Sequence, residues 1–362
     1  MEQQQGPPYQ PAIWSLGGAP IKHIDIPTQS VFLVLFMTGA ATHMTIYQKN
    51  LRRSHKFLPN ALTFGFCMAR IMTSILRIAS VSLPHDISLA IAAQIFVAAG
   101  VLIIFVINII FAQRLVRSMH PSVGWHPIFS IVFKIIYVLI GLTLVIVITA
   151  TVQTFYTLST NTHSIDRALQ LYGATFLAII ATLPIPIVFI SLVIPHSTPH
   201  DRFGTGRVRT KVIVLLTGAT LLSFGAWYRC GVAWQTPVPR TQPLPGYMGK
   251  APFYIANFTV EILTVYLYAA MRIDQRWHVP NGAKGSGSYS RGQKQMDGGE
   301  TQGEGAKQSS AEEGLADAGN DAESEAQSPS SVDKELDLEK GGANARFQMS
   351  HTKWIVITKT PV

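Results

Sequence analysis

The sequence predicts an all-α, multi-pass membrane protein with seven transmembrane helices and a disordered C-terminal tail. Three observations lead to this prediction: a weakly charged composition, seven apolar stretches long enough to span a bilayer, and a polar C-terminal part. Hydrophobic residues make up 48% of the 362 residues and charged residues only 14%. Soluble domains carry about 25% charged residues, so this composition argues against an ordinary soluble enzyme.

The seven apolar stretches define the predicted membrane domain, residues 26–278. A helix needs about 20 apolar residues to cross a hydrocarbon layer of about 30 Å. The stretches that meet this requirement are 26–47, 57–83, 88–113, 128–154, 171–194, 212–230 and 252–271. Residues 1–25 have no basic region typical of a cleaved signal peptide, so we expect them to form a short extracellular segment.

The basic residues between these stretches predict the orientation of the chain. The first, third and fifth loops contain ten lysines and arginines, and the alternate loops contain three. The residues of the first group are Lys49, Arg52, Arg53, Lys56, Arg114, Arg117, Arg202, Arg207, Arg209 and Lys211. Cytoplasmic loops are those enriched in Lys and Arg. We therefore expect the N-terminus outside the cell and the C-terminus in the cytoplasm.

Residues 279–362 form the predicted cytoplasmic tail. This segment contains 13 acidic and 9 basic residues, much Gly, Ser and Gln, and few apolar side chains. Such a composition cannot bury enough apolar surface to form a core, which predicts disorder. The two cysteines, Cys67 and Cys230, both fall in apolar stretches and do not form the pattern of a disulfide framework.

Ionisable residues within the predicted helices are candidates for a functional site, because charges at membrane depth are costly. Arg70 lies about 20 Å from the inner end of its helix and Glu261 about 15 Å, so we expect an ion pair between them. Two interpretations remain open: a structural salt bridge, or a ligand-binding site in which Glu261 titrates or contacts a polar headgroup or substrate while Arg70 and Arg77 hold an anionic group. Arg77 is expected near the outer surface. Arg229, next to Tyr228, is interpreted as an anchor at the membrane interface.

Other residues are expected to shape the interior of the bundle. Three polar residues are predicted to hydrogen-bond between helices: Gln94, Asn108 and Asn257. Pro184 and Pro186 are predicted to kink the fifth helix, because proline removes a backbone donor and clashes with the preceding turn.

The sequence shows no motif for catalysis, cofactor binding or metal binding. An intramembrane metal enzyme needs several His and carboxylate ligands within its helices, whereas His43 is the one histidine inside a predicted stretch. His120, His126, His196 and His200 lie in loops. No phosphate-binding loop of the Walker type is present. We therefore predict a protein that is not an enzyme, has no cofactor or metal, and has no nucleic-acid partner.

Two blocks of sequence carry a resemblance to known proteins. The first includes Ala92–Gly100, Asn108–Arg114 and His120–Trp125, and the second includes Phe253–Glu261 and Arg272–Gly282. Together they resemble an uncharacterised family of fungal integral membrane proteins with seven helices, which implies a fungal source and a membrane location.

A more distant similarity is to fungal lipid-translocating-exporter-like proteins. It rests on the aromatic residue and arginine at the end of helix six, Tyr228 and Arg229, on the acidic residue within helix seven, Glu261, and on the exit sequence His278–Gly282. This resemblance implies a role in the export of toxic amphiphiles.

Three functions remain as alternatives. The first is a non-catalytic carrier or efflux protein for lipids or toxic amphiphiles, and it predicts activity in pure lipid vesicles. The second is a sensor or receptor of the G-protein-coupled type, which predicts ligand-dependent coupling to a cytosolic protein. The third is a membrane organiser whose tail recruits a cytosolic partner, which predicts that deletion of residues 283–362 removes its effect. The plasma membrane is the expected location.

Overall fold

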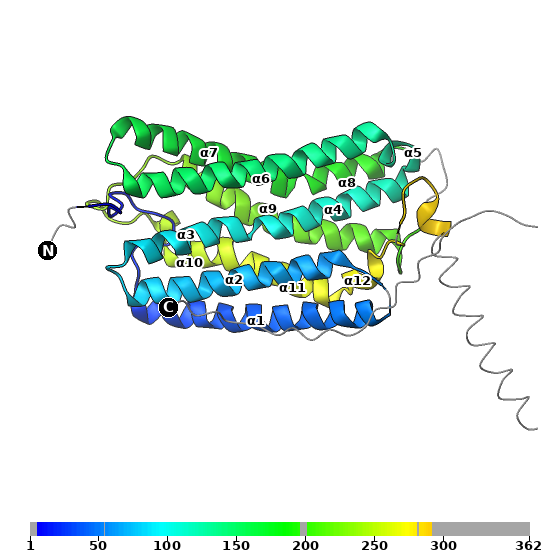
Figure 1. Cartoon of the computed structure of the whole chain (residues 1–362), viewed down its shortest axis with the longest axis horizontal. Helices are drawn as coiled ribbons and strands as arrows, with labels where there is room; N and C mark the ends of the chain where they lie inside the picture. Colours follow the sequence, from blue (N-terminus) through cyan, green and yellow to red (C-terminus); the bar gives the residue numbers. More distant parts are fainter. Residues whose placement is uncertain (1–5, 54, 196–200, 281, 292–362) are drawn as a thin grey trace, which may run out of the picture. The chain divides into compact units, whose positions relative to one another are not determined.

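The computed structural model describes residues 6–53, 55–195, 201–280 and 282–291. Within these residues, seven helical spans are long and apolar enough to cross a membrane (Figure 1). The spans are α1 (Lys22–Arg52), α2 (Leu58–Ser82), α3 with α4 (Ile87–Gly100 and Leu102–Met119), α6 (Pro127–Tyr156), α7 with α8 (Thr160–Thr182 and Pro184–Val193), α9 (Val208–Trp234), and α10, η2 and α11 together (Lys250–Tyr254, Ile255–Thr259 and Val260–Ala270). The predicted all-α fold with seven spans is confirmed.

The fifth span begins earlier than the sequence predicts. It starts at Thr160, eleven residues before the expected residue 171. Its first turns are polar and are started by Ser159, whose side chain accepts a hydrogen bond from the Thr162 amide. The span from Thr160 to Val193 has 34 residues, or about 51 Å of helix, which exceeds the thickness of the hydrocarbon layer. The polar turns can therefore extend beyond the apolar region.

Two of the spans, the third and the fifth, are interrupted. The fifth divides at Leu183, directly before Pro184, so the expected interruption is present at the first of the two prolines. The third divides at Val101, between α3 and α4. There the Val101 amide bonds to the Ala99 carbonyl rather than to the carbonyl four residues earlier.

The seventh span contains a π-helical segment, η2, between α10 and α11. The Thr259 hydroxyl also donates to the carbonyl of Tyr254, five residues before it, at 3.3 Å. The sequence patterns did not predict this segment. Short π-helical segments of this kind occur frequently at functional sites because they change the direction of the side chains that follow.

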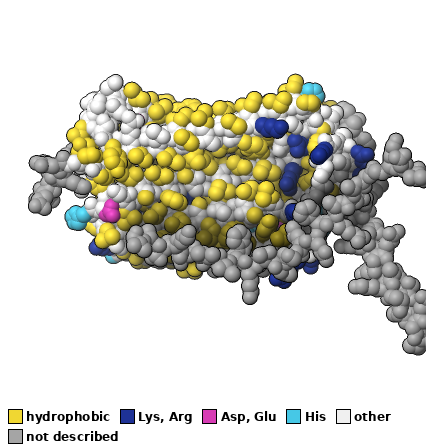
Figure 2. Space-filling model, in the orientation of Figure 1, with side chains coloured by type: hydrophobic (Ala, Val, Ile, Leu, Met, Phe, Trp, Pro, Cys, Tyr) yellow, Lys and Arg dark blue, Asp and Glu magenta, His cyan; other side chains and the backbone are white. Residues whose placement is uncertain are grey.

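Direct packing links four helices, α1, α2, α9 and α11. Helices α1 and α2 lie side by side, and both α1 and α9 pack against α11 (Figure 1). The sides of the helices carry mainly hydrophobic residues, while Lys and Arg gather at the end near α5 (Pro121–Gly124) (Figure 2). We call this the basic end. The opposite end carries the loops after α2, α6 and α9.

The first part of the predicted tail is packed at the basic end. Tyr289 is 1% exposed, and its ring lies 5.4 Å from that of Trp125. The Asp201 carboxylate accepts hydrogen bonds from the backbone amides of Gly287 and Ser290, at 3.0 and 2.8 Å. The boundary of the predicted disordered tail at residue 279 is therefore too early, because one buried ring and one capping carboxylate order residues 282–291.

Some sequence predictions fall on residues that the structure does not describe. These predictions concern the N-terminal residues 1–5, the loop histidines His196 and His200, and residues 292–362 of the tail.

Candidate functional site

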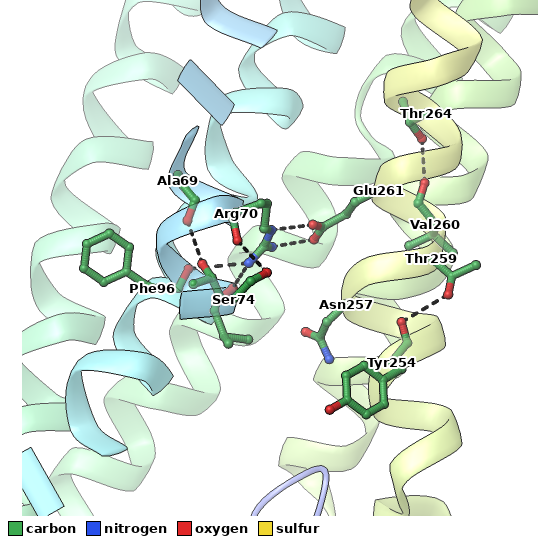
Figure 3. Close-up of polar contacts among 12 residues, drawn as sticks. Ala69, Arg70, Ser74, Phe96, Tyr254, Asn257, Thr259, Val260, Glu261 and Thr264 are labelled. Atoms are coloured by element: carbon green, nitrogen blue, oxygen red, sulfur yellow. Dashed lines mark hydrogen bonds and ion pairs between the residues drawn. The ribbon is translucent and has the colours of Figure 1, made fainter. Parts of the chain in front are cut away.

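Arg70 and Glu261 form a two-point ion pair in the interior of the bundle. Arg70 Nε donates to Glu261 Oε2 at 2.5 Å, and Arg70 Nη2 donates to Oε1 at 2.6 Å (Figure 3). The two side chains are 0% and 1% exposed. Arg70 is the central residue of α2, and Glu261 lies close to the middle of its span. The structure thus brings together the two residues that the depth argument paired.

The remaining nitrogen of Arg70 explains the interruption between α3 and α4. Arg70 Nη1 donates to the Val97 carbonyl at 3.0 Å and lies 3.5 Å from that of Phe96. The Val97 carbonyl would accept from Val101 in a continuous helix. A side chain that bonds to a helix carbonyl in place of the backbone amide four residues later interrupts the helix. Gly100 lies next to the guanidinium, and a Cβ there would be in ordinary van der Waals contact with Arg70 Nη1 at 3.4 Å.

Arg229 is a third charged member of this site. Its Nη1 lies 3.2 Å from Asn257 Oδ1 and 3.7 Å from Glu261 Oε1. The expectation that Arg229 anchors the protein at the membrane interface is therefore wrong. Its position near the end of α9 suggested an interfacial role, but its side chain is long enough to reach the interior. We refer to Arg70, Arg229, Asn257 and Glu261 as the charged cluster.

Close helix packing holds the cluster together. A Cβ at Gly225 would lie 2.4 Å from the Ala256 carbonyl oxygen, so α9 approaches η2 more closely than any larger residue would allow. Asn257 lies within η2, and its Nδ2 donates to the Phe253 carbonyl at 2.8 Å. This bond fixes the amide, so that its oxygen faces Arg229 on α9.

Arg77 belongs to a second polar group, which lies toward the end of the bundle opposite the basic end. Its guanidinium lies 4.2 Å from the centre of the Phe253 ring, and the structure does not bring it to Glu261. The adjacent Tyr254 donates its hydroxyl to Asp25 at 2.9 Å, and Lys250 pairs with the same carboxylate at 2.5 Å. Sequence reasoning missed this pair, because residue 25 was assigned to the extracellular segment rather than to a helix.

The other predicted interior residues have different outcomes. Asn108 is 1% exposed, and Tyr268 donates a short hydrogen bond to its carbonyl oxygen. The prediction that Gln94 hydrogen-bonds in the bundle interior is wrong, because its side chain is exposed on α3. It follows Ala93, which is 3% exposed, and one residue turns the side chain by about 100° around a helix. The buried residues of α3 are Ile87, Ile91, Ala93 and Gly100, and Gln94 is not among them.

The predicted kink residues lie away from the charged cluster. Pro184 is buried at the start of α8, whereas Pro186 is exposed. They change the course of the fifth span but contribute no group to the cluster.

The cluster has the chemistry of a binding site for an anion. Two guanidinium groups face one carboxylate, which gives a formal charge of +1 when all three groups are ionised. Guanidinium groups bind carboxylate and phosphate through paired hydrogen bonds. The sequence did not indicate that Arg229 belongs to this cluster. Its position in the chain does not predict which neighbouring helix its long side chain reaches.

Comparison with known proteins gives no relative for this chain. No protein-family model matches it, no curated protein is similar to it at a significant level, and no solved structure matches it. The expected membership of a fungal family therefore stays a prediction.

Proposed function

We propose that this integral membrane protein is a non-catalytic carrier or efflux protein for lipids or other amphiphiles. We propose further that the charged cluster receives the polar headgroup of the cargo. The observation that supports the proposal is the second arginine, Arg229, beside an ion pair that is already complete at 2.5 and 2.6 Å.

The energetic argument is that a structural salt bridge needs one arginine for one carboxylate. An additional charge near the middle of a membrane costs about 3 kcal/mol on insertion scales. Intramembrane ionisable residues that face the bundle interior therefore usually mark a binding site or a pathway. Binding sites of carriers also lie within the membrane, where helix irregularities such as η2 expose polar groups.

The plasma membrane is the location that we propose for this activity. The apolar span α6 has 30 residues, or about 45 Å of helix, which fits one of the thicker cellular bilayers.

The test is translocation of fluorescent lipids and amphiphiles across vesicles that contain only the purified protein. We expect movement of the probe above the rate in protein-free vesicles, without any cytosolic component. Absence of translocation by the wild-type protein, in vesicles with both orientations present, would overturn the carrier proposal and favour the receptor alternative.

Variants of the ion pair test whether the cluster takes part. Glu261→Gln removes the carboxylate, and the double variant Arg70→Gln with Glu261→Gln removes the complete pair while the formal charge of +1 remains. We expect both to lose translocation if they elute as folded monodisperse protein. Unchanged translocation by the folded double variant would exclude the ion pair from the site.

A further inference from the structure

We propose that Arg229 binds the acidic headgroup of a monoanionic amphiphile, a carboxylate or a phosphate diester that carries an acyl chain. This inference rests on the proposed function, because it names the substrate class of the same site. It assigns the ligand contact to Arg229 and gives Arg70 a structural role.

Arg70 is fully engaged within the protein. Its Nε and Nη2 hold the Glu261 carboxylate, and its Nη1 holds the Val97 carbonyl at 3.0 Å. Phe66 and Phe258 lie on the guanidinium at 5.7 and 5.6 Å. A ligand could reach this group only by breaking an ion pair whose two side chains are 0% and 1% exposed. Arg70 therefore orients Glu261 and does not contact cargo.

Arg229 differs from Arg70 in the number of its contacts. Both its contact with Asn257 and its longer contact with Glu261 use the same nitrogen, Nη1. A guanidinium has five N–H donors arranged in a planar fork. The other edge of the fork is thus free of these two contacts, and it matches the two oxygens of a carboxylate or a phosphate.

The charge of the cluster selects the class of ligand. With one carboxylate against two arginines, a single negative charge brings the formal total to zero. Neutralisation matters most in a medium of low dielectric, where an unpaired charge is strongly disfavoured. A cationic amphiphile would raise the total to +2, so the site should reject it.

The position of Arg229 gives a ligand access. It lies on the face of α9 that also carries Leu222 and Ala226, which are 1% and 3% exposed, so it points to the bundle interior. Nevertheless, 22% of its side chain is exposed. The exposed part of the side chain is where a ligand could contact it. Arg229 precedes the end of α9 at Trp234 by five residues, so its backbone lies about 7.5 Å from that end.

The experiment measures binding rather than transport, in phosphatidylcholine nanodiscs that hold the full-length protein. The probes are spin-labelled stearate and spin-labelled phosphatidylglycerol, with spin-labelled phosphatidylcholine and a spin-labelled stearyl ammonium as controls. We expect an immobilised spectral component for the anionic probes and none above background for the cation. The two anionic probes distinguish a carboxylate from a phosphate diester.

Variants locate the contact. We expect Arg229→Gln to weaken binding of the anionic probes at least about tenfold, and Arg229→Lys to weaken it less, since it retains the charge but not the fork. Arg240→Gln removes one positive charge from the loop after α9, where Arg240 bonds to the Ile13 carbonyl, and should leave binding unchanged. If Arg229→Gln does not fold, the Arg229→Lys protein decides the question.

The outcomes separate this inference from the proposed function. Equal immobilisation of anionic and cationic probes, or binding that survives in both Arg229 variants, would overturn the assignment to Arg229. Selective binding of the anions without translocation would overturn the carrier proposal and leave this inference intact. Translocation that does not depend on headgroup charge would support the carrier proposal and overturn the assignment of the acidic headgroup to Arg229.

Discussion

At the scale of single residues, Glu261 balances only one of the two arginines within reach of its carboxylate. Its oxygens lie 2.5 and 2.6 Å from Arg70 and 3.7 Å from Arg229. The two arginines are therefore not equivalent. Loss of Arg70 leaves Glu261 with a second partner, whereas loss of Glu261 leaves the buried Arg70 and the partly exposed Arg229 without a carboxylate.

This asymmetry predicts the order of stability of two single variants. We expect Glu261→Gln to destabilise the folded protein by about 3–5 kcal/mol, the usual effect of leaving a buried charge unpaired. Arg70→Gln should destabilise it less, because Arg229 can move to the free carboxylate. The double variant should be more stable than Glu261→Gln alone. Thermal unfolding in detergent measures this order, and an Arg70→Gln protein less stable than Glu261→Gln would contradict it.

The contrast between Glu261 and Arg229 shows where residue-level prediction from sequence succeeds. The rise per residue of a helix fixes the depth of Arg70 and Glu261, and helix proximity then suggests the pair. Arg229 lies five residues from the end of its helix, a position that is also common for interfacial anchors. Only the distance to Glu261 and Asn257 distinguishes the two roles, and that distance depends on helix packing.

At the scale of helices, the spans follow from apolar length, while their irregularities come from tertiary contacts. The interruption at Val101 reflects a bond from Arg70, and no proline or polar cluster marks it in the sequence. The interruption before Pro184 could be predicted, because proline acts on its own helix. Gln94 was misplaced for a similar reason, since its orientation depends on which face of α3 meets α2.

The contact between α9 and η2 predicts the effect of a small substitution at Gly225. A Cβ there would lie 2.4 Å from the Ala256 carbonyl oxygen and 3.0 Å from Val260 Cγ2. We expect Gly225→Ala to force the helices apart, to destabilise the protein by about 1–3 kcal/mol, and to weaken binding at Arg229. The measurements are the unfolding temperature and the nanodisc binding described above.

Gly231 on the same helix provides the matched control. No heavy atom lies within 4 Å of a Cβ at this position. Alanine has a higher helix propensity than glycine, so Gly231→Ala should be neutral or slightly stabilising. Equal effects of the two substitutions would show that helix propensity, and not the approach of α9 to η2, determines the result.

At the scale of the whole molecule, the basic end lies at one end of the bundle, and the Arg229 backbone lies near the other end. Lys and Arg gather at the end near α5 (Figure 2). Arg229 lies five residues before the end of α9 at Trp234. If the basic end faces the cytoplasm, as the distribution of Lys and Arg predicts, the site at Arg229 is reached from the outer leaflet. The orientation therefore decides from which side cargo enters.

Labelling of single cysteines with a membrane-impermeant maleimide in intact cells tests this orientation. The native Cys67 and Cys230 are 0% and 3% exposed, so the wild-type protein should give little background. Thr241→Cys lies in the loop after α9, and Ser122→Cys lies in α5; both positions are exposed. We expect Thr241→Cys to react in intact cells and Ser122→Cys to react only after permeabilisation, because the basic end should not cross the membrane. The reverse pattern would place Arg229 near the cytoplasmic leaflet, and cargo would then enter the site from the inner leaflet.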